Sequence, residues 1–345
     1  MALDKIAAIV ALTGIMAYAI FGGADFGSGI WSALASGPRA GQRRNALYRA
    51  IGPVWETNNV WLILIVVVLL TAFPKAMGDL FTALIFPLSA GLIGIVFRGA
   101  GFAFRNYSRE SGGSTAPWLG VVFSIASVIT PFAFGVALGA TAGGEIELVN
   151  GAVVGGIFRY WVHAVPLLFG VTAVAVCSYL TMSYMTTRST GDLREDFRVR
   201  GLLAGAAVGL LAVATLAVSY WDARDFWNLW QRPAPLAMSG VALLAGLASL
   251  VVLWRRWYML APAATGGAMA LLVAAWGVIQ YPYFIVPSEK IFDVASNQAM
   301  IRDALVGLLC GAVILIPSLL LLYLNFVAES AEEADESAEQ AKGEA

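Results

Sequence analysis

The 345-residue sequence contains a single histidine, His163. Haem groups and histidine-rich metal sites need axial or clustered imidazoles, and one histidine cannot supply bis-histidine ligation or several haems. His163 lies beside Trp161, close to an apolar segment, which is typical of an interfacial histidine with ordinary hydrogen bonds. We therefore expect the chain to hold little or no redox metal of its own.

Cysteine is almost as scarce, and nucleotide-binding motifs are missing. Cys177 and Cys310 both lie inside apolar runs without C-x-x-C spacing, so we expect buried thiols rather than a disulfide or a zinc site. The sequence has neither a P-loop nor a Rossmann fingerprint. These absences exclude the common nucleotide sites, and nothing indicates a nucleic-acid partner.

Charge is also sparse. Charged residues make up 12% of the chain and hydrophobic residues 59%, with a mean hydropathy of +0.78, whereas soluble domains carry about 25% charged residues. The charges separate apolar runs of roughly 18 to 25 residues, the length that crosses a bilayer as a helix. The first run starts with Asp4 and Lys5 and contains Asp25, unlike a cleaved signal peptide. The sequence predicts an all-α polytopic membrane protein.

Nine apolar segments within residues 1–327 are predicted to span the membrane. Their approximate limits are Ile6–Ala35, Val54–Phe73, Leu80–Phe97, Trp118–Ala140, Trp161–Met185, Gly201–Tyr220, Leu236–Trp254, Ala264–Phe284 and Ala304–Val327. Of the 21 lysines and arginines, fourteen fall on one side of these segments and seven on the other. Because basic loops stay in the cytoplasm, we expect the N-terminus outside and the C-terminus inside.

The last stretch, residues 328–345, contains seven acids, one lysine and no bulky apolar side chain. Such a segment cannot bury enough apolar surface to order itself, so we expect a solvated, disordered cytoplasmic tail. A binding role for this tail is the alternative.

Two acids stand out within or beside the apolar segments. Glu56 lies in the stretch G-P-V-W-E-T-N-N-V-W-L, followed by Asn58 and Asn59 and flanked by Trp55 and Trp61. Asp25 lies in the first segment among glycines, and residues 23 and 27 would let another helix approach closely.

Acids at such positions are costly and often functional. Asp25 lies about ten residues, roughly 15 Å of helix, from the cytoplasmic end of its segment. Glu56 is near the first turn of the next segment on the same side. We interpret the two acids, with Asn58 and Asn59, as a proton entry. The alternative for Glu56 is a helix cap or an ion pair with a loop arginine.

Three further polar side chains lie near the predicted ends of segments. Arg98 and Arg105 follow the third segment and are interpreted as anchors for lipid phosphates, as arginines at a cytoplasmic interface usually are. Gln280 lies in W-G-V-I-Q-Y-P-Y-F-I-V-P and is interpreted as a buried amide. It stands beside Pro282, where the helix loses a backbone hydrogen bond and can kink, and among aromatics typical of the membrane interface.

Four segments together resemble subunit II of the cytochrome bd-type quinol oxidases. G-G-A-D-F-G-S-G (22–29) resembles the family's D-G-F-D-x-G-x-G, and the stretch 52–63 resembles P-x-W-D-G-N-x-V-W-L-I. R-G-A-G-F-A-F-R (98–105) resembles R-P-x-G-F-x-[YF]-R, and 275–288 is similar to the eighth-helix segment of the cyanide-insensitive branch. The sequence departs from the family at Gly22, at Glu56 in place of aspartate, and at A-V-C-S-Y-L (175–180), which lacks the family's histidine. We expect a divergent branch.

The resemblance implies nine helices arranged as two four-helix bundles plus one peripheral helix, in a prokaryotic cell membrane. It also implies a haem-free subunit that stabilises a haem-bearing subunit I of a quinol:oxygen oxidoreductase. No cofactor is then expected on this chain, apart from a structural quinone or lipid, and small single-helix subunits are conceivable partners. The aspartate matched by Glu56 belongs to a proposed proton route toward the oxygen-reducing haem.

Two other functions stay open at this point. The chain could be a proton- or ion-coupled transporter with Asp25 and Glu56 as coupling acids, although it lacks the visible internal repeats of many transporters. It could also be a purely structural scaffold.

Overall fold

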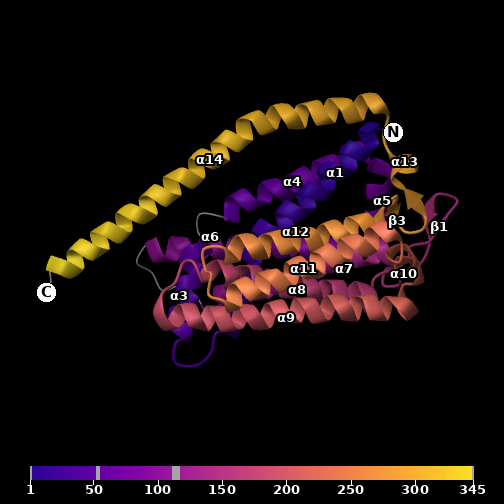
Figure 1. The fold of residues 1–345 in the computed structure, drawn as a ribbon. Helices are drawn as coiled ribbons and strands as arrows, with labels where there is room; N and C mark the ends of the chain where they lie inside the picture. Colours follow the sequence, from indigo (N-terminus) through magenta and orange to yellow (C-terminus); the bar gives the residue numbers. More distant parts are fainter. Residues whose placement is uncertain (1, 52–54, 111–116, 344–345) are drawn as a thin grey trace. The chain divides into compact units, whose positions relative to one another are not determined.

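A computed structural model describes the backbone of residues 2–51, 55–110 and 117–343, and the side chains of residues 3–50, 58–104, 118–319 and 321. Over these residues the chain is almost entirely helical, with two short antiparallel hairpins (Figure 1). It divides into two compact units, Met1–Ser296 and Asn297–Ala345.

The first unit contains all elements except the last helix. Its helices are α1 (Ala2–Ala17), the π-helix η1 (Tyr18–Gly22), α2 (Gly23–Leu34), α3 (Ala40–Ile51), α4 (Trp55–Ala72), α5 (Pro74–Ala83), α6 (Ile85–Glu110), α7 (Pro117–Gly143), α8 (Ala164–Met185), α9 (Gly191–Asp222), α10 (Arg224–Trp230), α11 (Pro233–Trp254), α12 (Ala261–Gln280) and α13 (Ile291–Val294). Strand β1 (Leu148–Val149) pairs with β2 (Ala152–Val153), and β3 (Tyr283–Ile285) pairs with β4 (Glu289–Lys290).

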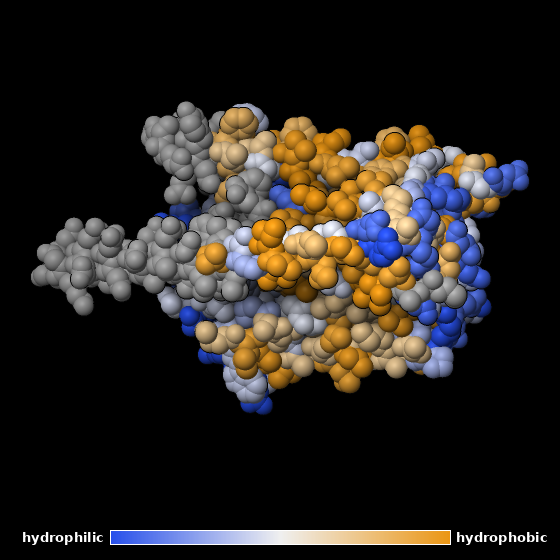
Figure 2. Space-filling model, turned by 90° about the horizontal axis from the view of Figure 1, so that it is seen from above, coloured by the Kyte–Doolittle hydropathy of each residue, from blue (hydrophilic) through white to orange (hydrophobic). Residues whose placement is uncertain are grey.

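Eight helical stretches among the described residues are long and apolar enough to cross a membrane. A ninth span is obtained if the bent pair α4 and α5 counts as one. The predicted all-α polytopic membrane protein is therefore confirmed. Figure 2 shows hydrophobic residues over most of the visible face, with hydrophilic ones gathered toward its right-hand end.

The bend between α4 and α5 corrects the predicted third segment, Leu80–Phe97. Pro74 has no backbone N–H and restricts the residue before it, so α4 ends at Ala72 and α5 leaves at 115°. The free carbonyl of Ala72 accepts a hydrogen bond from the Ser296 amide at 2.8 Å. The following span starts only at Ile85 and runs beyond the predicted end at Phe97.

The predicted eighth segment, Ala264–Phe284, is corrected at its end, because α12 ends at Gln280. Pro282 prevents the helix from continuing, and the chain instead forms the β3–β4 hairpin. This hairpin lies at one end of the first unit together with β1, α5, α10 and α13 (Figure 1).

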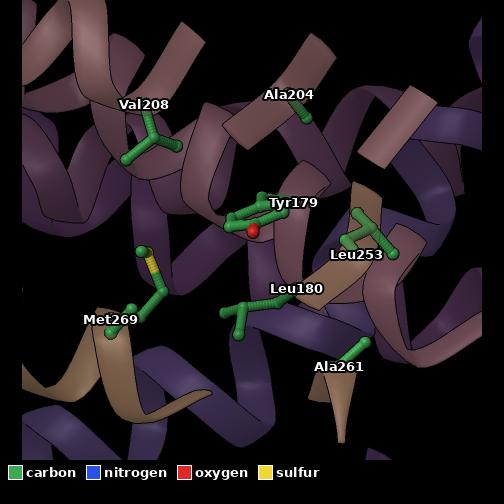
Figure 3. Close-up of a cluster of buried hydrophobic side chains, with 8 residues drawn as sticks. Tyr179, Leu180, Ala204, Val208, Leu253, Ala261 and Met269 are labelled. Atoms are coloured by element: carbon green, nitrogen blue, oxygen red, sulfur yellow. The ribbon is translucent and has the colours of Figure 1, made fainter. Parts of the chain in front are cut away.

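The spanning helices of the first unit group in chain order. The first group is α1–α2, α4, α6 and α7, and the second is α8, α9, α11 and α12, with α7 and α2 packed against α8 between them. This grouping agrees with the predicted two four-helix bundles. In the second group, Tyr179 and Leu180 of α8 lie between Ala204 and Val208 of α9 and Met269 of α12 (Figure 3).

The second unit is one helix, α14 (Gln298–Gly343). The predicted disordered tail, 328–345, differs from this structure, which continues α14 as far as Gly343. The residues Ala, Glu and Lys that fill the tail are strong helix formers, which accounts for the difference. That the tail is solvated, and that the membrane domain ends at residue 327, stay predictions.

Candidate functional site

A buried ion pair joins the first and third spans. Asp25 of α2 and Arg98 of α6 are each 6% exposed. The Arg98 Nη2 lies 2.6 Å from Oδ1 of Asp25, and its Nη1 lies 2.9 Å from Oδ2. Nη2 also donates to the Asp25 backbone carbonyl at 3.1 Å. This two-pronged geometry is the strong form of an arginine–carboxylate pair.

The remaining surface of the guanidinium is enclosed as well. Its Nε donates to Ser127 Oγ at 3.2 Å, and its carbon lies 4.8 and 5.0 Å from the ring centres of Phe26 and Phe123. A cation between aromatic faces is stabilised by about 2 kcal/mol when it is desolvated. Arg98 is thus fixed by charge, hydrogen bonds and aromatic rings at once.

The helix is irregular where it approaches this pair. The π-helix η1 interrupts the first span immediately before α2, and such wide turns are frequent at functional sites. The carbonyl of Phe21, within η1, accepts a hydrogen bond from Asn58 Nδ2 of α4 at 3.0 Å. The Phe21 ring stacks on Trp61, with ring centres 6.1 Å apart. The second span is therefore fixed to the first next to Asp25.

A small cavity, with about 20 Å³ of space for water, opens where these elements meet. Its lining residues are Tyr18, Gly22, Asp25, Phe26, Asn58, Asn59, Ile95, Arg98 and Gly99. The cavity has polar groups from three spans and is large enough for ordered water, which needs two to four polar partners. An arrangement of this kind can hold hydrogen-bonded water beside a fixed pair of opposite charges.

The structure brings together three of the four residues predicted for a proton route. Asp25, Asn58 and Asn59 line the same cavity. Glu56 lies in the first turn of α4, less than one turn before Asn58 and Asn59, but its side chain lies outside the described residues. The side chains of Trp55 and Arg105 also lie outside them.

The interpretation of Arg98 as an anchor for lipid phosphates is corrected. Arg98 is no lipid anchor, because α6 continues to Glu110 and places it well inside the helix. Gln280 is 7% exposed, and its Nε2 donates to the carbonyls of Thr141 and Phe284 at 3.1 and 3.0 Å. Gln280 is thus a buried amide, and it fixes the end of α12 to α7.

Sequence reasoning missed the partner of Asp25. A carboxylate in an apolar run needs a compensating charge, and that requirement was a signal for Arg98. The apolar stretch from Gly99 to Phe104 was a second signal, since it extends the third span beyond the arginine. Ser127, Phe26 and Phe123 carry no sequence signal of their own.

A second charged cluster lies at the β3–β4 hairpin. Glu289 is 4% exposed and is bonded to Lys75 of α5, which also pairs with Asp79 at 2.9 Å. Burial raises the pKa of the Glu289 carboxyl above its ordinary value, and the hydrogen bond from the Lys75 ammonium opposes that rise only in part. This cluster joins the hairpin to the α4–α5 bend.

His163 lies apart from both clusters. Its Nε2 is 2.7 Å from the carbonyl oxygen of Arg159, and its Nδ1 is 3.9 Å from Asp222. Among the described side chains, no three His, Cys, Asp or Glu residues come together as a metal site would require.

Comparison with known proteins places this architecture in a family. The family model described as "Cytochrome bd terminal oxidase subunit II" matches residues 3–326. The chain belongs to the cytochrome bd terminal oxidase subunit II family. The match covers nearly the whole chain, including both spans of the buried pair and the stretch around Glu56.

Individual relatives are distant in sequence, and the matched share of their length differs from one to another. The chain is 24% identical over 339 residues to "Putative cytochrome bd menaquinol oxidase subunit II" of Bacillus subtilis, covering 94% of this chain and 96% of the relative. It is 26% identical over 206 residues to "Cytochrome bd-I ubiquinol oxidase subunit 2" of Escherichia coli, covering 59% of this chain and 53% of the relative.

A solved structure shares the fold. "The structure of bd oxidase from Geobacillus thermodenitrificans" contains a chain with a TM-score of 0.79 and 23% identity, with 94% of this chain and 99% of that chain covered. The chain is thus a multi-pass subunit of an oxidoreductase complex. The transporter alternative is not favoured.

Proposed function

We propose that this chain is the haem-free subunit of a quinol:oxygen oxidoreductase and that it stabilises a haem-bearing subunit I. The relatives are named as menaquinol and ubiquinol oxidase subunits. The single histidine supports the haem-free role, because one imidazole cannot ligate several haems. His163 lies just before α8, with its ring nitrogens near the Arg159 carbonyl and Asp222. The haems would then belong to the partner.

We further propose that the subunit leads protons from the cytoplasm toward the oxygen-reducing site of that partner. The observation that carries this proposal is the polar cavity at Asp25, Asn58 and Asn59, directly beyond the helix turn that contains Glu56. Oxygen reduction consumes protons, and drawing them from inside builds a membrane potential without pumping. The excess of basic residues on this side supports the orientation, with the N-terminus outside and the C-terminus inside.

Asp25 has a different part in this route from Glu56. The Asp25 carboxylate is the counter-charge of the buried Arg98 guanidinium. It orients water in the cavity, together with Asn58 and Asn59. Glu56, at the mouth of α4, is the group that exchanges its proton.

The test is the oxidase complex reconstituted in vesicles, with quinol-driven oxygen consumption and membrane potential measured together. Glu56→Gln should lower both while haem content and subunit assembly stay normal. Glu56→Asp, which restores the residue type of the resembled family motif, should keep both high. Unchanged turnover in Glu56→Gln would leave the subunit as a scaffold without a proton route.

A further inference from the structure

Tyr18 borders the cavity at Asp25, but it is not one of the four residues of the proposed proton route. It is the first residue of the π-helix η1 and lines the cavity together with Gly22 and Asp25. A phenol hydroxyl can donate one hydrogen bond and accept another. No other described residue forms a hydrogen bond with the Tyr18 hydroxyl, so this group can serve a water molecule in the cavity.

The Tyr18 ring occupies the space beside Gly22. A Cβ added at Gly22 would lie 3.1 Å from Cε2 of Tyr18 and 3.6 Å from Cζ, the carbon that carries the hydroxyl. The resembled motif D-G-F-D-x-G-x-G has an aspartate at this position, where this chain has glycine. The phenol of Tyr18 therefore lies where the side chain of an acid at residue 22 would begin.

The ring is held in this place by its neighbours. Its centre lies 6.2 Å from that of Phe26 and 6.3 Å from that of Phe134, both in edge-to-face arrangements. It also packs against the cluster that contains Phe26 and Cys177. These contacts involve the ring alone, so a phenylalanine at residue 18 would keep them and lose only the oxygen.

Other donors at the cavity are already bound within the protein. All three guanidinium nitrogens of Arg98 donate to Asp25 or to a serine of α7, and Asn58 Nδ2 donates to a backbone carbonyl of η1. The space of about 20 Å³ is enough for roughly one water molecule, which needs two to four polar partners. The Tyr18 hydroxyl supplies a partner that these bound donors do not.

We propose that the Tyr18 hydroxyl donates a hydrogen bond to water in this cavity and takes the place of an acid at residue 22 in positioning it. This inference rests on the proposed function, because the water matters for turnover only if protons pass it. In the proposed orientation the first span runs inward, so Tyr18 lies on the side of Asp25 away from the cytoplasm and from Glu56. Tyr18 is thus a positioning residue, and the proton passes through the water.

The test follows proton uptake with a pH-sensitive dye when the fully reduced oxidase complex is mixed with oxygen. Tyr18→Phe is the main variant, and Glu56→Gln is measured beside it. Tyr179→Phe is the matched control, because it removes a buried phenol oxygen in the second helix group, where Tyr179 lies 3.0 Å from Ser249 Oγ. A further pair compares Tyr18→Leu with Tyr18→Leu combined with Gly22→Asp, which returns an acid to the space that the ring leaves.

We expect Tyr18→Phe to slow proton uptake about tenfold, the equivalent of one hydrogen bond, at normal haem content and with Tyr179→Phe at the wild-type rate. Gly22→Asp should speed uptake in the Tyr18→Leu background, a recovery that a merely structural role would not give.

Wild-type uptake in Tyr18→Phe together with slow uptake in Glu56→Gln would overturn this inference and leave the proposed route standing. Wild-type uptake in both variants would overturn the route and this inference with it. Equal slowing in Tyr18→Phe and Tyr179→Phe, or no recovery by Gly22→Asp at normal haem content, would also show that the phenol does not position the water.

Discussion

Asp25 and Arg98 illustrate why charges occur inside an apolar bundle. Each alone would be expensive to bury, and each is compensated by the other with short bonds at 2.6 and 2.9 Å. The rings of Phe26 and Phe123 cover part of the guanidinium, which raises the cost of losing one partner. The pair thereby links α2 to α6 and also gives the cavity a fixed dipole.

Removing one charge of this pair should destabilise the subunit strongly. Asp25→Asn leaves the guanidinium without a counter-ion and should lower the free energy of unfolding by about 3–5 kcal/mol. Thermal unfolding of the purified complex measures the change. The double variant Asp25→Asn with Arg98→Gln should recover part of the loss, and a double variant less stable than Asp25→Asn alone would contradict this account.

Glu289 should give the protein a pH-dependent stability. Burial raises its pKa, so the folded chain holds this proton more tightly than the unfolded chain does. Its contribution to stability is therefore present below about pH 4.3, the ordinary pKa of glutamate, and decreases as the pH rises through the folded-state pKa.

The corresponding measurement is the unfolding midpoint of wild type and Glu289→Gln between pH 4 and pH 8. The wild type should lose stability relative to Glu289→Gln as the pH rises. Glu147→Gln is the control, since this acid is 53% exposed and pairs with Arg159 at the surface. A wild type that gains stability over Glu289→Gln across this range would show that the Lys75 bond outweighs burial.

At the residue scale, the sequence predicts which side chains need partners but not which partners they find. Asp25 and the asparagines 58 and 59 were identifiable because polar groups in apolar runs are rare. Arg98 was misplaced because it was taken to follow the end of its span, although apolar residues continue after it. Helix ends in a membrane protein are set by packing and water exposure, which residue types describe only approximately.

Among the elements, the contact of α2 with α8 depends on missing side chains. A Cβ added at Gly27 would collide with Thr181 Oγ1 and with the Cys177 carbonyl of α8. Thr181 Oγ1 also donates to the Ala24 carbonyl at 2.6 Å across the same contact. The predicted close approach at residues 23 and 27 is confirmed, and it brings Asp25 within reach of the other spans.

Gly27→Ala should therefore force the two helices apart and cost about 1–3 kcal/mol of stability, as overpacking does. Gly209→Ala in α9 is the matched control, because no atom lies within 4 Å of its added Cβ. Unfolding midpoints of the two variants should differ clearly. Equal midpoints would mean that α2 and α8 are not held in this close contact.

The predicted helix boundaries were wrong at two prolines. Pro74 produces the α4–α5 bend, and Pro282 ends α12, whereas Pro131 lies within α7 without ending it. A proline in an apolar run is compatible with either outcome, because neighbouring groups can replace the lost hydrogen bond. The Ser296 amide does this for Ala72, and Gln280 bonds to Phe284 at the other break.

For the whole molecule, the family, the helical class and the order of the spans were predictable from hydropathy and four short motifs. The length of α14 was not predictable in this way. Its 46 residues correspond to about 69 Å of helix, more than twice the ~30 Å hydrocarbon thickness. The apolar part was recognisable, whereas the acidic part was judged by its lack of apolar side chains rather than by its helix propensity.

The proposed orientation can be tested by labelling. Lys290→Cys, at the β3–β4 hairpin, should react with a membrane-impermeant maleimide on intact cells, and Arg255→Cys, after α11, should react only after the membrane is opened. A Cys310→Ser background removes the exposed native thiol. Labelling in the reverse pattern would place the basic loops outside and invert the proposed proton entry.

The most direct test of the central claim is proton uptake itself. The fully reduced complex is mixed with oxygen, and uptake from solution is followed with a pH-sensitive dye in wild type, Glu56→Asp and Glu56→Gln. We expect Glu56→Asp to remain close to wild type and Glu56→Gln to slow uptake about 10²-fold, the lower range for a positioned proton-transfer group. Uptake at the wild-type rate in Glu56→Gln, with normal haem content, would contradict the account.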